Sequence, residues 1–244
     1  MAPARHLLVM ARTKVAIKVF PDLWFDTIGA LMKLPALFFA ILCVLSPIAY
    51  GQDWKPVYEK DGIAVAKKVL PDSSLMPFRG EGIVDVHISK LVGVIKTAGL
   101  GPDWVDLQVE SKELHRDSDE AAIIYNKYDL SWPVSDRDYL MQQRTTYDAD
   151  NKVVTVTYES IEDPRWPPDD CCVRAVAVRT YWKFEYVSAT QTKIEVEVYT
   201  DPKGALPAWL VNMIQRGWPY NSITGISARA KKTDVTAHPR CTDW

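Results

Sequence analysis

The sequence predicts an α+β protein in which an antiparallel sheet is covered by a long C-terminal helix. Six strand-like segments follow one another between residues 104 and 200 and are joined by short, turn-rich connections, which is typical of an antiparallel meander. Apolar and polar residues alternate within these segments, so one face of the sheet is dry. A helical pattern over residues 208–232 follows the last strand and is the main candidate to cover that face.

The composition is that of a globular protein. Of its 244 residues, 48% are hydrophobic and 25% are charged, and the formal net charge is -2. Because charges of both signs are interspersed, there is no broad basic surface for nucleic acid and no obvious attraction to an anionic membrane. We find no internal repeats, and we expect residues 52–244 to form one monomeric domain.

Residues 1–51 predict an export signal rather than part of the fold. A lysine precedes an apolar run over residues 34–45, and a small-x-small pattern ends at Gly51, where we expect cleavage. The run has about a dozen residues, whereas a bilayer span needs about 20. We therefore expect a periplasmic or secreted protein, with Met32 as an alternative start. If residues 24–31 extend the run, the alternative is a protein anchored in the membrane through an uncleaved N-terminal helix.

The mature chain is expected to open with strands and a short helix. Asp61 and Gly62, within residues 57–69, give a strong hairpin signal. Residues 78–86 alternate as a third strand, and residues 88–100 carry apolar side chains at helical spacing.

The meander shows clear alternation. In its last strand, Ile194, Val196 and Val198 share one face while charged residues share the other. One face of this strand is therefore expected to be buried. The six strands are expected over residues 104–116, 121–132, 138–148, 152–161, 173–187 and 193–200.

Arg174 is the exception to this pattern, because it falls on the apolar side of its strand. The apolar side is formed by Val176, Val178, Thr180, Trp182 and Phe184. A guanidinium keeps its charge and must find a partner or a polar ligand group when it is buried. The alternative is that Arg174 reaches solvent at the end of the strand.

The final helix is expected to begin close to Pro207, since proline is favoured in a first helical turn. Pro219 lies inside the pattern and should kink the helix. The apolar stripe of the helix is formed by Leu206, Leu210, Met213 and Ile214.

Three cysteines remain after the expected cleavage, namely Cys171, Cys172 and Cys241. Export would place them in an oxidising compartment, where cysteines tend to pair. Adjacent cysteines rarely bond to each other, so we expect Cys241 to pair with one of the other two. The alternative is that all three stay free.

Signals for catalysis are missing from the sequence. The four histidines are scattered, without the paired spacing of a zinc site, and neither a phosphate-binding glycine loop nor a GxSxG motif is present. The acids Asp136, Asp138, Asp163 and Asp201 fall at strand ends or turns, where such residues commonly serve the turn. We therefore predict no catalytic residue, no metal and no cofactor, and hence a protein that is not an enzyme.

Three segments resemble the START family of lipid-transfer domains, and their order and spacing extend the resemblance over most of residues 52–244. They are SWPVSDRDYL at 131–140, VRAVAVRTYWKFEYV at 173–187 and YTDPKGALPAWLVNMI at 199–214. The motif positions of the family fall on Trp132, Pro133, Ser135, Arg137, Asp138, Val173, Arg174, Ala175, Asp201, Pro202, Gly204, Pro207, Trp209, Leu210, Val211 and Asn212.

The resemblance implies a helix-grip fold, in which a curved antiparallel sheet wraps the long C-terminal helix around a tunnel for one sterol, phospholipid or similar molecule. Steroid-binding relatives pair an arginine with a buried acid in the tunnel. Here the arginine position is Gln143, and Arg144 is expected to face outward. The preceding strand offers Asn126 and Tyr128 instead of an acid. The sequence is thus similar to a lipid-binding member rather than to a sterol-binding one.

We therefore predict that one lipid or other hydrophobic small molecule lies in the tunnel, that residues 201–207 act as its gate, and that the protein contacts membranes transiently. Two alternatives are a helix-grip enzyme of the cyclase or hydrolase type and an envelope interaction protein without a ligand. The predicted ligand-binding residues are Asn126, Tyr128, Tyr139, Met141, Gln143, Val156, Arg174, Val176, Trp182, Val196, Leu210, Met213 and Ile214.

Overall fold

The computed structural model describes residues 54–130 and 134–244. The predicted export signal or anchor over residues 1–51 and the motif residues Trp132 and Pro133 lie outside the described residues. Within the two described ranges, no helix combines the length and the apolar character needed to cross a membrane.

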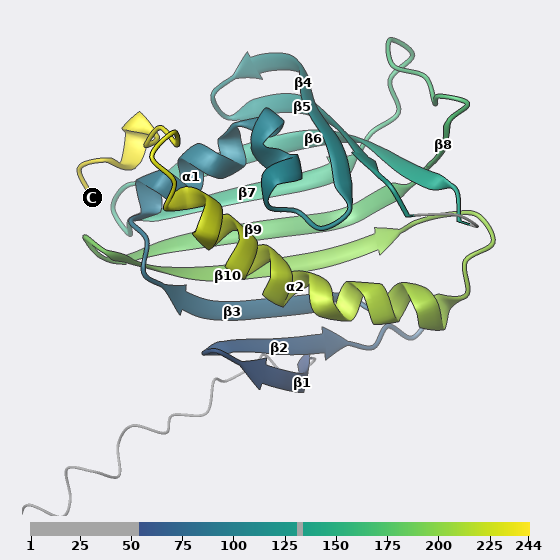
Figure 1. The fold of residues 1–244 in the computed structure, drawn as a ribbon, viewed down its shortest axis with the longest axis horizontal. Helices are drawn as coiled ribbons and strands as arrows, with labels where there is room; N and C mark the ends of the chain where they lie inside the picture. The colour runs from purple at the N-terminus through teal and green to yellow at the C-terminus, as the bar shows by residue number, and fades with distance from the viewer. Residues whose placement is uncertain (1–53, 131–133) are drawn as a thin grey trace, which may run out of the picture. The chain divides into compact units, whose positions relative to one another are not determined.

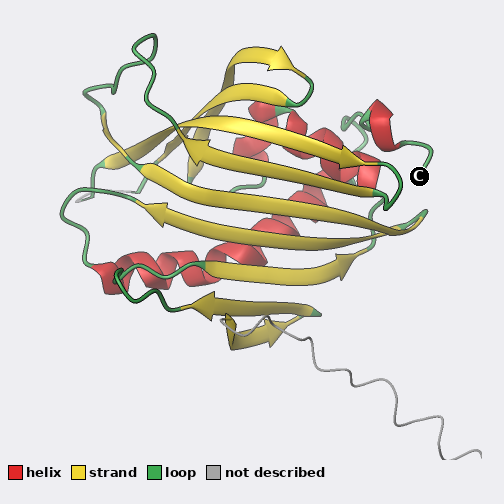
Figure 2. Cartoon of the chain, turned by 180° about the vertical axis from the view of Figure 1, so that it is seen from behind, coloured by secondary structure: helices red, strands yellow, loops and turns green. Residues whose placement is uncertain are grey.

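The described residues form one curved ten-stranded sheet, with both α-helices on the same face (Figures 1 and 2). Nine strands follow the order β1-β2-β3-β10-β9-β7-β6-β5-β4, and β8 pairs with β6 in parallel. The α+β, helix-grip class predicted from the sequence is confirmed. The strands are β1 (Trp54–Lys60), β2 (Ile63–Lys68), β3 (Phe78–Val84), β4 (Gln108–Ser118), β5 (Ala121–Tyr128), β6 (Asp136–Asp148), β7 (Val153–Ser160), β8 (Cys172–Arg174), β9 (Val176–Ser188) and β10 (Gln191–Asp201).

The first helix, α1 (Ile88–Lys96), is shorter than the predicted 88–100. It is capped by His87, whose Nδ1 accepts a hydrogen bond from the backbone N–H of Ser89. After Thr97 the chain tightens into the 3₁₀ helix η1 (Ala98–Asp103). Pro102 lies inside η1 and cannot donate a backbone hydrogen bond, which is compatible with this short turn but not with a longer α-helix.

The strand predicted over residues 173–187 is divided, and part of its predicted alternation is wrong. β8 ends at Arg174 and β9 begins at Val176. Opposite β10, Tyr199 pairs with Arg179 but Thr200 pairs with Ala177, so Val178 is the extra residue of a β-bulge. The bulge reverses the faces: Val178 is 45% exposed and Ala177 only 2%.

Helix α2 (Ala208–Ala230) crosses the concave face of the sheet and changes direction along its length (Figure 1). It remains one helix through Pro219. A methyl group at Gly80 would lie 2.8 Å from the Cβ of Pro219, so glycine allows the helix to approach β3 closely. The predicted apolar stripe is only partly correct, since Met213 is 59% exposed while Val211, Gln215 and Ser222 are buried.

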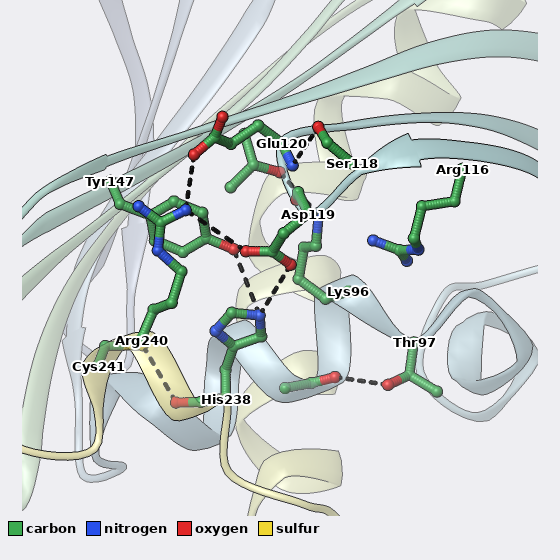
Figure 3. A network of polar contacts seen from close by, with 12 residues as sticks. Lys96, Thr97, Arg116, Ser118, Asp119, Glu120, Tyr147, His238, Arg240 and Cys241 are labelled. Carbon is green, nitrogen blue, oxygen red and sulfur yellow. Dashed lines mark hydrogen bonds and ion pairs between the residues drawn. The ribbon is translucent and has the colours of Figure 1, made fainter.

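A polar network fixes the C-terminal segment, residues 231–244, to α1 and to the β4–β5 turn (Figure 3). The His238 Nε2 atom lies 3.3 Å from the Asp119 carboxylate, and its ring stacks on Tyr147 at 5.5 Å. The Lys96 ammonium donates to the carbonyl oxygen of Asp119, and Arg240 pairs with Glu120. The network and a hydrogen bond from the His238 backbone N–H to the Ser89 carbonyl oxygen fix the end of the chain to α1 and to the β4–β5 turn.

The expected disulfide is wrong. Cys171 and Cys172 bond to each other, while Cys241 is free and buried in the C-terminal segment. The C-terminal segment and β8 lie at opposite ends of the sheet (Figures 1 and 2). The fold therefore keeps Cys241 away from Cys171 and Cys172. These two bond to each other, although disulfides between adjacent cysteines are generally rare.

Candidate functional site

A large cavity lies between the sheet and the N-terminal half of α2. We call it the α2 chamber; its volume is about 510 Å³. Most of its wall is apolar or aromatic, and its charged residues are Arg137 and Asp106. The α2 chamber is lined by Asp106, Leu107, Tyr128, Leu130, Arg137, Tyr139, Met141, Ala177, Thr180, Val198, Thr200, Pro202, Leu206, Val211, Ile214, Gln215, Trp218 and Asn221.

A smaller cavity of about 80 Å³ lies beside the C-terminal end of α1. We call it the α1 chamber. It shares Tyr128, Met141, Thr180 and Trp218 with the α2 chamber, so the two chambers adjoin. The α1 chamber is lined by Val94, Ile95, Thr97, Ala98, Gly101, Trp104, Val105, Gln108, Ser111, Ile124, Asn126, Tyr128, Met141, Gln143, Tyr158, Thr180, Trp182 and Trp218.

Strand alternation positions most of the polar wall. Tyr139, Met141 and Gln143 occupy alternate positions of β6 and project from the same face. Asn126 and Tyr128 do the same on β5, where Asn126 lies opposite Tyr139. Two adjacent strands thus place five predicted ligand-binding residues in the two chambers.

Seven of the predicted ligand-binding residues line a chamber. Besides the five on β5 and β6, Trp182 lines the α1 chamber and Ile214 lines the α2 chamber. Val156 and Val196 are instead fully buried in the packed core. Val176, Leu210 and Met213 are also absent from the walls of both chambers.

Arg174 lies outside both chambers because another part of the protein binds it. Its guanidinium makes two contacts with the fully buried carboxylate of Asp138, at 3.1 and 2.9 Å. It also donates to the carbonyl oxygens of Trp166 and Pro167. The partner that the sequence required for Arg174 is therefore a protein carboxylate.

Several wall residues were not predicted. Thr180 shares a strand face with Trp182, so alternation alone could have found it. Ala177 is on the wall because of the β-bulge, which no periodic signal marks. Gln215 and Trp218 lie one helical turn apart on α2, and a buried glutamine within that helix was the available signal.

The chamber walls contain few charged side chains, and these already have hydrogen-bond partners in the protein. Arg137 is buried and donates to the carbonyl oxygens of Ser135, Pro202 and Lys203. Asp106 accepts a 2.6 Å hydrogen bond from the side chain of Asn221. The wall of the α1 chamber contains no Asp, Glu, Lys, Arg or His.

The buried phenols act as neutral hydrogen-bonding groups. Burial raises the pKa of Tyr139 to about 12 and also raises the pKa values of Tyr128 and Tyr158. The Tyr158 hydroxyl accepts a 2.7 Å hydrogen bond from Gln143 and donates to the carbonyl oxygen of Ile95. None of these phenols is therefore ionised near neutral pH, and none is suited to act as a base.

Indole and phenol rings form a stiff aromatic wall. Trp182 meets Trp104 edge to face at 5.7 Å and Trp218 at 5.9 Å. Tyr128 and Tyr139 make a similar contact at 5.5 Å. Tyr128 and Trp218 line both chambers, so aromatic rings extend from one chamber into the other.

Comparisons with known proteins point to one family. A family model described as "START domain" matches residues 45–218. The chain is 26% identical over 185 residues to an uncharacterised protein of Pseudomonas aeruginosa, covering 75% of this chain and 90% of that protein. It is 26% identical over 170 residues to the phosphatidylcholine transfer protein of Mus musculus, covering 68% and 78%. The crystal structure of human STARD10 matches with a TM-score of 0.70 at 20% identity, covering 76% of each chain.

Proposed function

The chain belongs to the START domain family, and from that premise we propose that it binds one lipid-like molecule in the α1 and α2 chambers without chemically changing it. The observation that carries the proposal is the α2 chamber. Its volume of about 510 Å³ falls within the roughly 300–1,000 Å³ of small-molecule sites, and its wall is largely apolar. A relative of this chain is named a phosphatidylcholine transfer protein, which supports a lipid as the ligand class.

The hydrocarbon part of the ligand would supply most of the affinity. Burial of apolar surface contributes roughly 25 cal/mol per Å², so a few hundred Å² would offset the cost of ordering the ligand. The few charged groups at the wall already have protein partners, and the phenols are neutral. This arrangement supports binding rather than acid–base catalysis.

We further propose that the ligand exchanges through a gate formed by residues 201–207, which run from the last residue of β10 to the start of α2. Arg137 holds this segment closed by donating to the carbonyl oxygens of Pro202 and Lys203, at 3.0 and 3.1 Å. Lys203 and Gly204 adopt positive φ values of 53° and 71°, in the left-handed region. Pro202 and Leu206 of this segment line the α2 chamber, so a change in the segment would open and close the chamber.

Transfer would also require transient contact with a membrane, for which the start of α2 is suited. Trp209 is 67% exposed and Met213 59% exposed, next to Ile214 at the chamber wall. Tryptophan favours the interface between lipid headgroups and water. With a net charge of -2, attachment would depend on these apolar side chains rather than on attraction to anionic lipid.

We propose a periplasmic or secreted location on the pattern of residues 1–51. Mass spectrometry of the protein purified from its native host tests this location, because the mass shows where the mature chain begins. A chain that begins after Gly51 supports export with cleavage, whereas a chain that retains residues 34–45 supports the anchored alternative.

Native mass spectrometry of protein from its own host tests the binding function. We expect a one-to-one complex with a co-purified lipid, and ligand-free protein should extract a labelled lipid from donor vesicles. Ala177→Trp should abolish both results by filling the α2 chamber. Val178→Trp is the matched control, because the neighbouring side chain is 45% exposed and lines neither chamber. A compact species that never takes up lipid would refute the proposal.

A further inference from the structure

Three polar atoms in the wall of the α1 chamber are buried without a hydrogen-bond partner. They are the indole Nε1 of Trp104, the amide Oε1 of Gln108 and the amide Oδ1 of Asn126. Such groups are nearly always satisfied in folded proteins, and each unsatisfied one costs about 1–3 kcal/mol. Three in a cavity of about 80 Å³ indicate a place that is built for another molecule.

The surrounding structure fixes two of these groups on neighbouring strands. Gln108 begins β4 and lies opposite Tyr128 of β5, while Asn126 of β5 lies opposite Ser111. Gln108 is 6% exposed and packs over Gly101, where a methyl group would lie 2.3 Å from its Oε1. Glycine at position 101 therefore leaves the space that this buried amide occupies.

The third group comes from the connection between η1 and β4. The indole of Trp104 is held edge to face against Trp182, and its backbone carbonyl packs against Gly225 of α2. Because these contacts fix the ring, the indole N–H cannot easily turn toward another partner.

The amide of Gln143, which also lines the α1 chamber, is already satisfied. Gln143 donates to the Tyr158 hydroxyl and accepts from the Lys96 ammonium at 3.2 Å. Lys96 also donates to Thr145 and to the carbonyl oxygen of Asp119, and it is not part of the wall. Among the buried side-chain atoms of this wall, the unsatisfied groups are thus one donor and two acceptors, and all three are uncharged.

We propose that the α1 chamber receives the uncharged polar end of the ligand, a hydroxyl or an N–H-bearing amide, and that Trp104, Gln108 and Asn126 determine this specificity. A group of this class accepts from the indole and donates to an amide oxygen. A phosphate or ammonium group would lose its hydration with no opposite charge in the wall, which is costly. The inference rests on the proposed lipid binding and narrows the ligand to a neutral lipid with a hydrogen-bonding head.

Four probes with the same oleoyl chain test the inference on the ligand-free protein: oleamide, monooleoylglycerol, methyl oleate and oleoyl lysophosphatidylcholine. Affinities are measured by displacement of a fluorescent fatty probe. Oleamide and monooleoylglycerol should bind at least about tenfold more tightly than methyl oleate, which accepts but cannot donate. The charged lysophospholipid should bind more weakly than both.

Three variants assign the preference to the named residues. Trp104→Phe should weaken the binding of oleamide and of methyl oleate alike, because the carbonyl oxygen of either probe can accept from the indole. Gln108→Met and Asn126→Leu should each reduce the preference for oleamide over methyl oleate to less than about threefold, because each removes an acceptor that only oleamide can use. The last two variants should also be at least as stable as the wild type without ligand, since each removes an unsatisfied polar atom. If either residue served only the fold, its substitution would lower the stability of the protein instead.

The outcomes separate the inference from the proposed function. Equal affinity for oleamide and methyl oleate, or tightest binding of the lysophospholipid, overturns the inference while lipid binding stands. Failure of all four probes and of the fluorescent probe overturns lipid binding, and the inference with it.

Discussion

The guanidinium of Arg174 and the carboxylate of Asp138 form a two-contact ion pair, in which Asp138 is completely buried. The pair joins β8 to β6, which otherwise meet only over a short parallel stretch. Breaking a buried ion pair by removing one partner typically costs about 3–5 kcal/mol, because the other charge is left uncompensated. Arg174 is therefore a structural residue that fixes the β8 end of the sheet.

Arg174→Met should lower the free energy of unfolding by about 3–5 kcal/mol in urea denaturation. Arg179→Met is the matched control on the same strand region, because Arg179 is exposed, and its effect should stay within about 0.5 kcal/mol. Lipid affinity of the folded Arg174→Met protein should be unchanged. Intact stability with lost lipid binding would instead show that Arg174 contacts the ligand.

Gly225→Ala should destabilise the protein by about 1–3 kcal/mol through overpacking. The new methyl group would lie 2.3 Å from the backbone carbonyl oxygen of Trp104, and backbone cannot easily move away. Gly217→Ala on the same helix is the control, since its nearest neighbour would be the side chain of Asn221 at 3.9 Å. That change should raise stability by up to about 1 kcal/mol. Similar denaturation midpoints for the two variants would contradict close packing at position 225.

Trp209→Ser combined with Met213→Ser should weaken binding to uncharged phosphatidylcholine vesicles about tenfold or more in a sedimentation assay. Burying one large apolar side chain is worth about 1.5–3 kcal/mol, and both side chains are exposed in the folded protein. Val69→Ser combined with Val187→Ser removes two exposed apolar side chains elsewhere and should leave vesicle binding unchanged. If both pairs behave alike, the start of α2 is not the membrane-contacting surface.

A disulfide between Ser74→Cys and Asn212→Cys should slow lipid exchange by restraining the start of α2. The Asn212 side chain already bridges the backbone at Ser74 and Met76, so the two positions are close. Exchange of a fluorescent lipid should slow at least tenfold in the oxidised protein and recover after reduction, while Asn212→Cys alone stays fast. Unchanged exchange in the fully cross-linked protein would rule out a gate that needs α2 to move.

Acid should destabilise the protein through His238. Burial lowers the pKa of His238 from its ordinary value of 6.5, despite the opposing attraction of Asp119. The unfolded chain therefore binds more protons just below pH 6.5, and this contribution to stability is complete above that pH and is lost as pH falls through the lowered pKa. Urea denaturation of the wild type should show a falling free energy of unfolding between pH 7 and pH 5.

His115 provides the control for this pH effect. Burial tends to raise the pKa of Asp119, but Tyr147, Lys96 and His238 outweigh it and lower that pKa below its ordinary 3.8, so Asp119 titrates outside this window. His238→Phe should flatten the dependence, whereas His115→Gln, on the exposed part of β4, should retain it. A slope that survives His238→Phe would assign the effect to another group.

The alternation of apolar and polar residues predicted the sheet well, because burying one face of a strand directly requires that alternation. Ile194 and Val196 are fully buried, as the pattern indicated, since a strand with one buried face must repeat every two residues. Asn126, Tyr128 and Gln143 were instead predicted from the family resemblance, and alternation along β5 and β6 explains why they share a face with Tyr139 and Met141. Arg144 is exposed, also as expected.

The failures of prediction arise where structure is not periodic. The bulge at Val178 depends on pairing with β10, which no local pattern records. Trp104 comes from the irregular connection before β4, and Gln108 is the first residue of β4, where its side chain packs over Gly101. The predicted apolar stripe of α2 is only partly correct, because Met213 faces solvent while Ile214 lines the α2 chamber.

The pairing of β3 with β10 also joins two strands that are far apart in the sequence. Val198 lies opposite Phe78, so β3 finds its second neighbour only after more than one hundred further residues have been synthesised. Until then one edge of the N-terminal three-strand unit is unprotected and can pair with other chains. Contacts this distant in sequence also slow folding, toward the millisecond-to-second range of β-rich domains. The last strand and helix therefore complete the early sheet, and a chain truncated before β10 would be prone to aggregate.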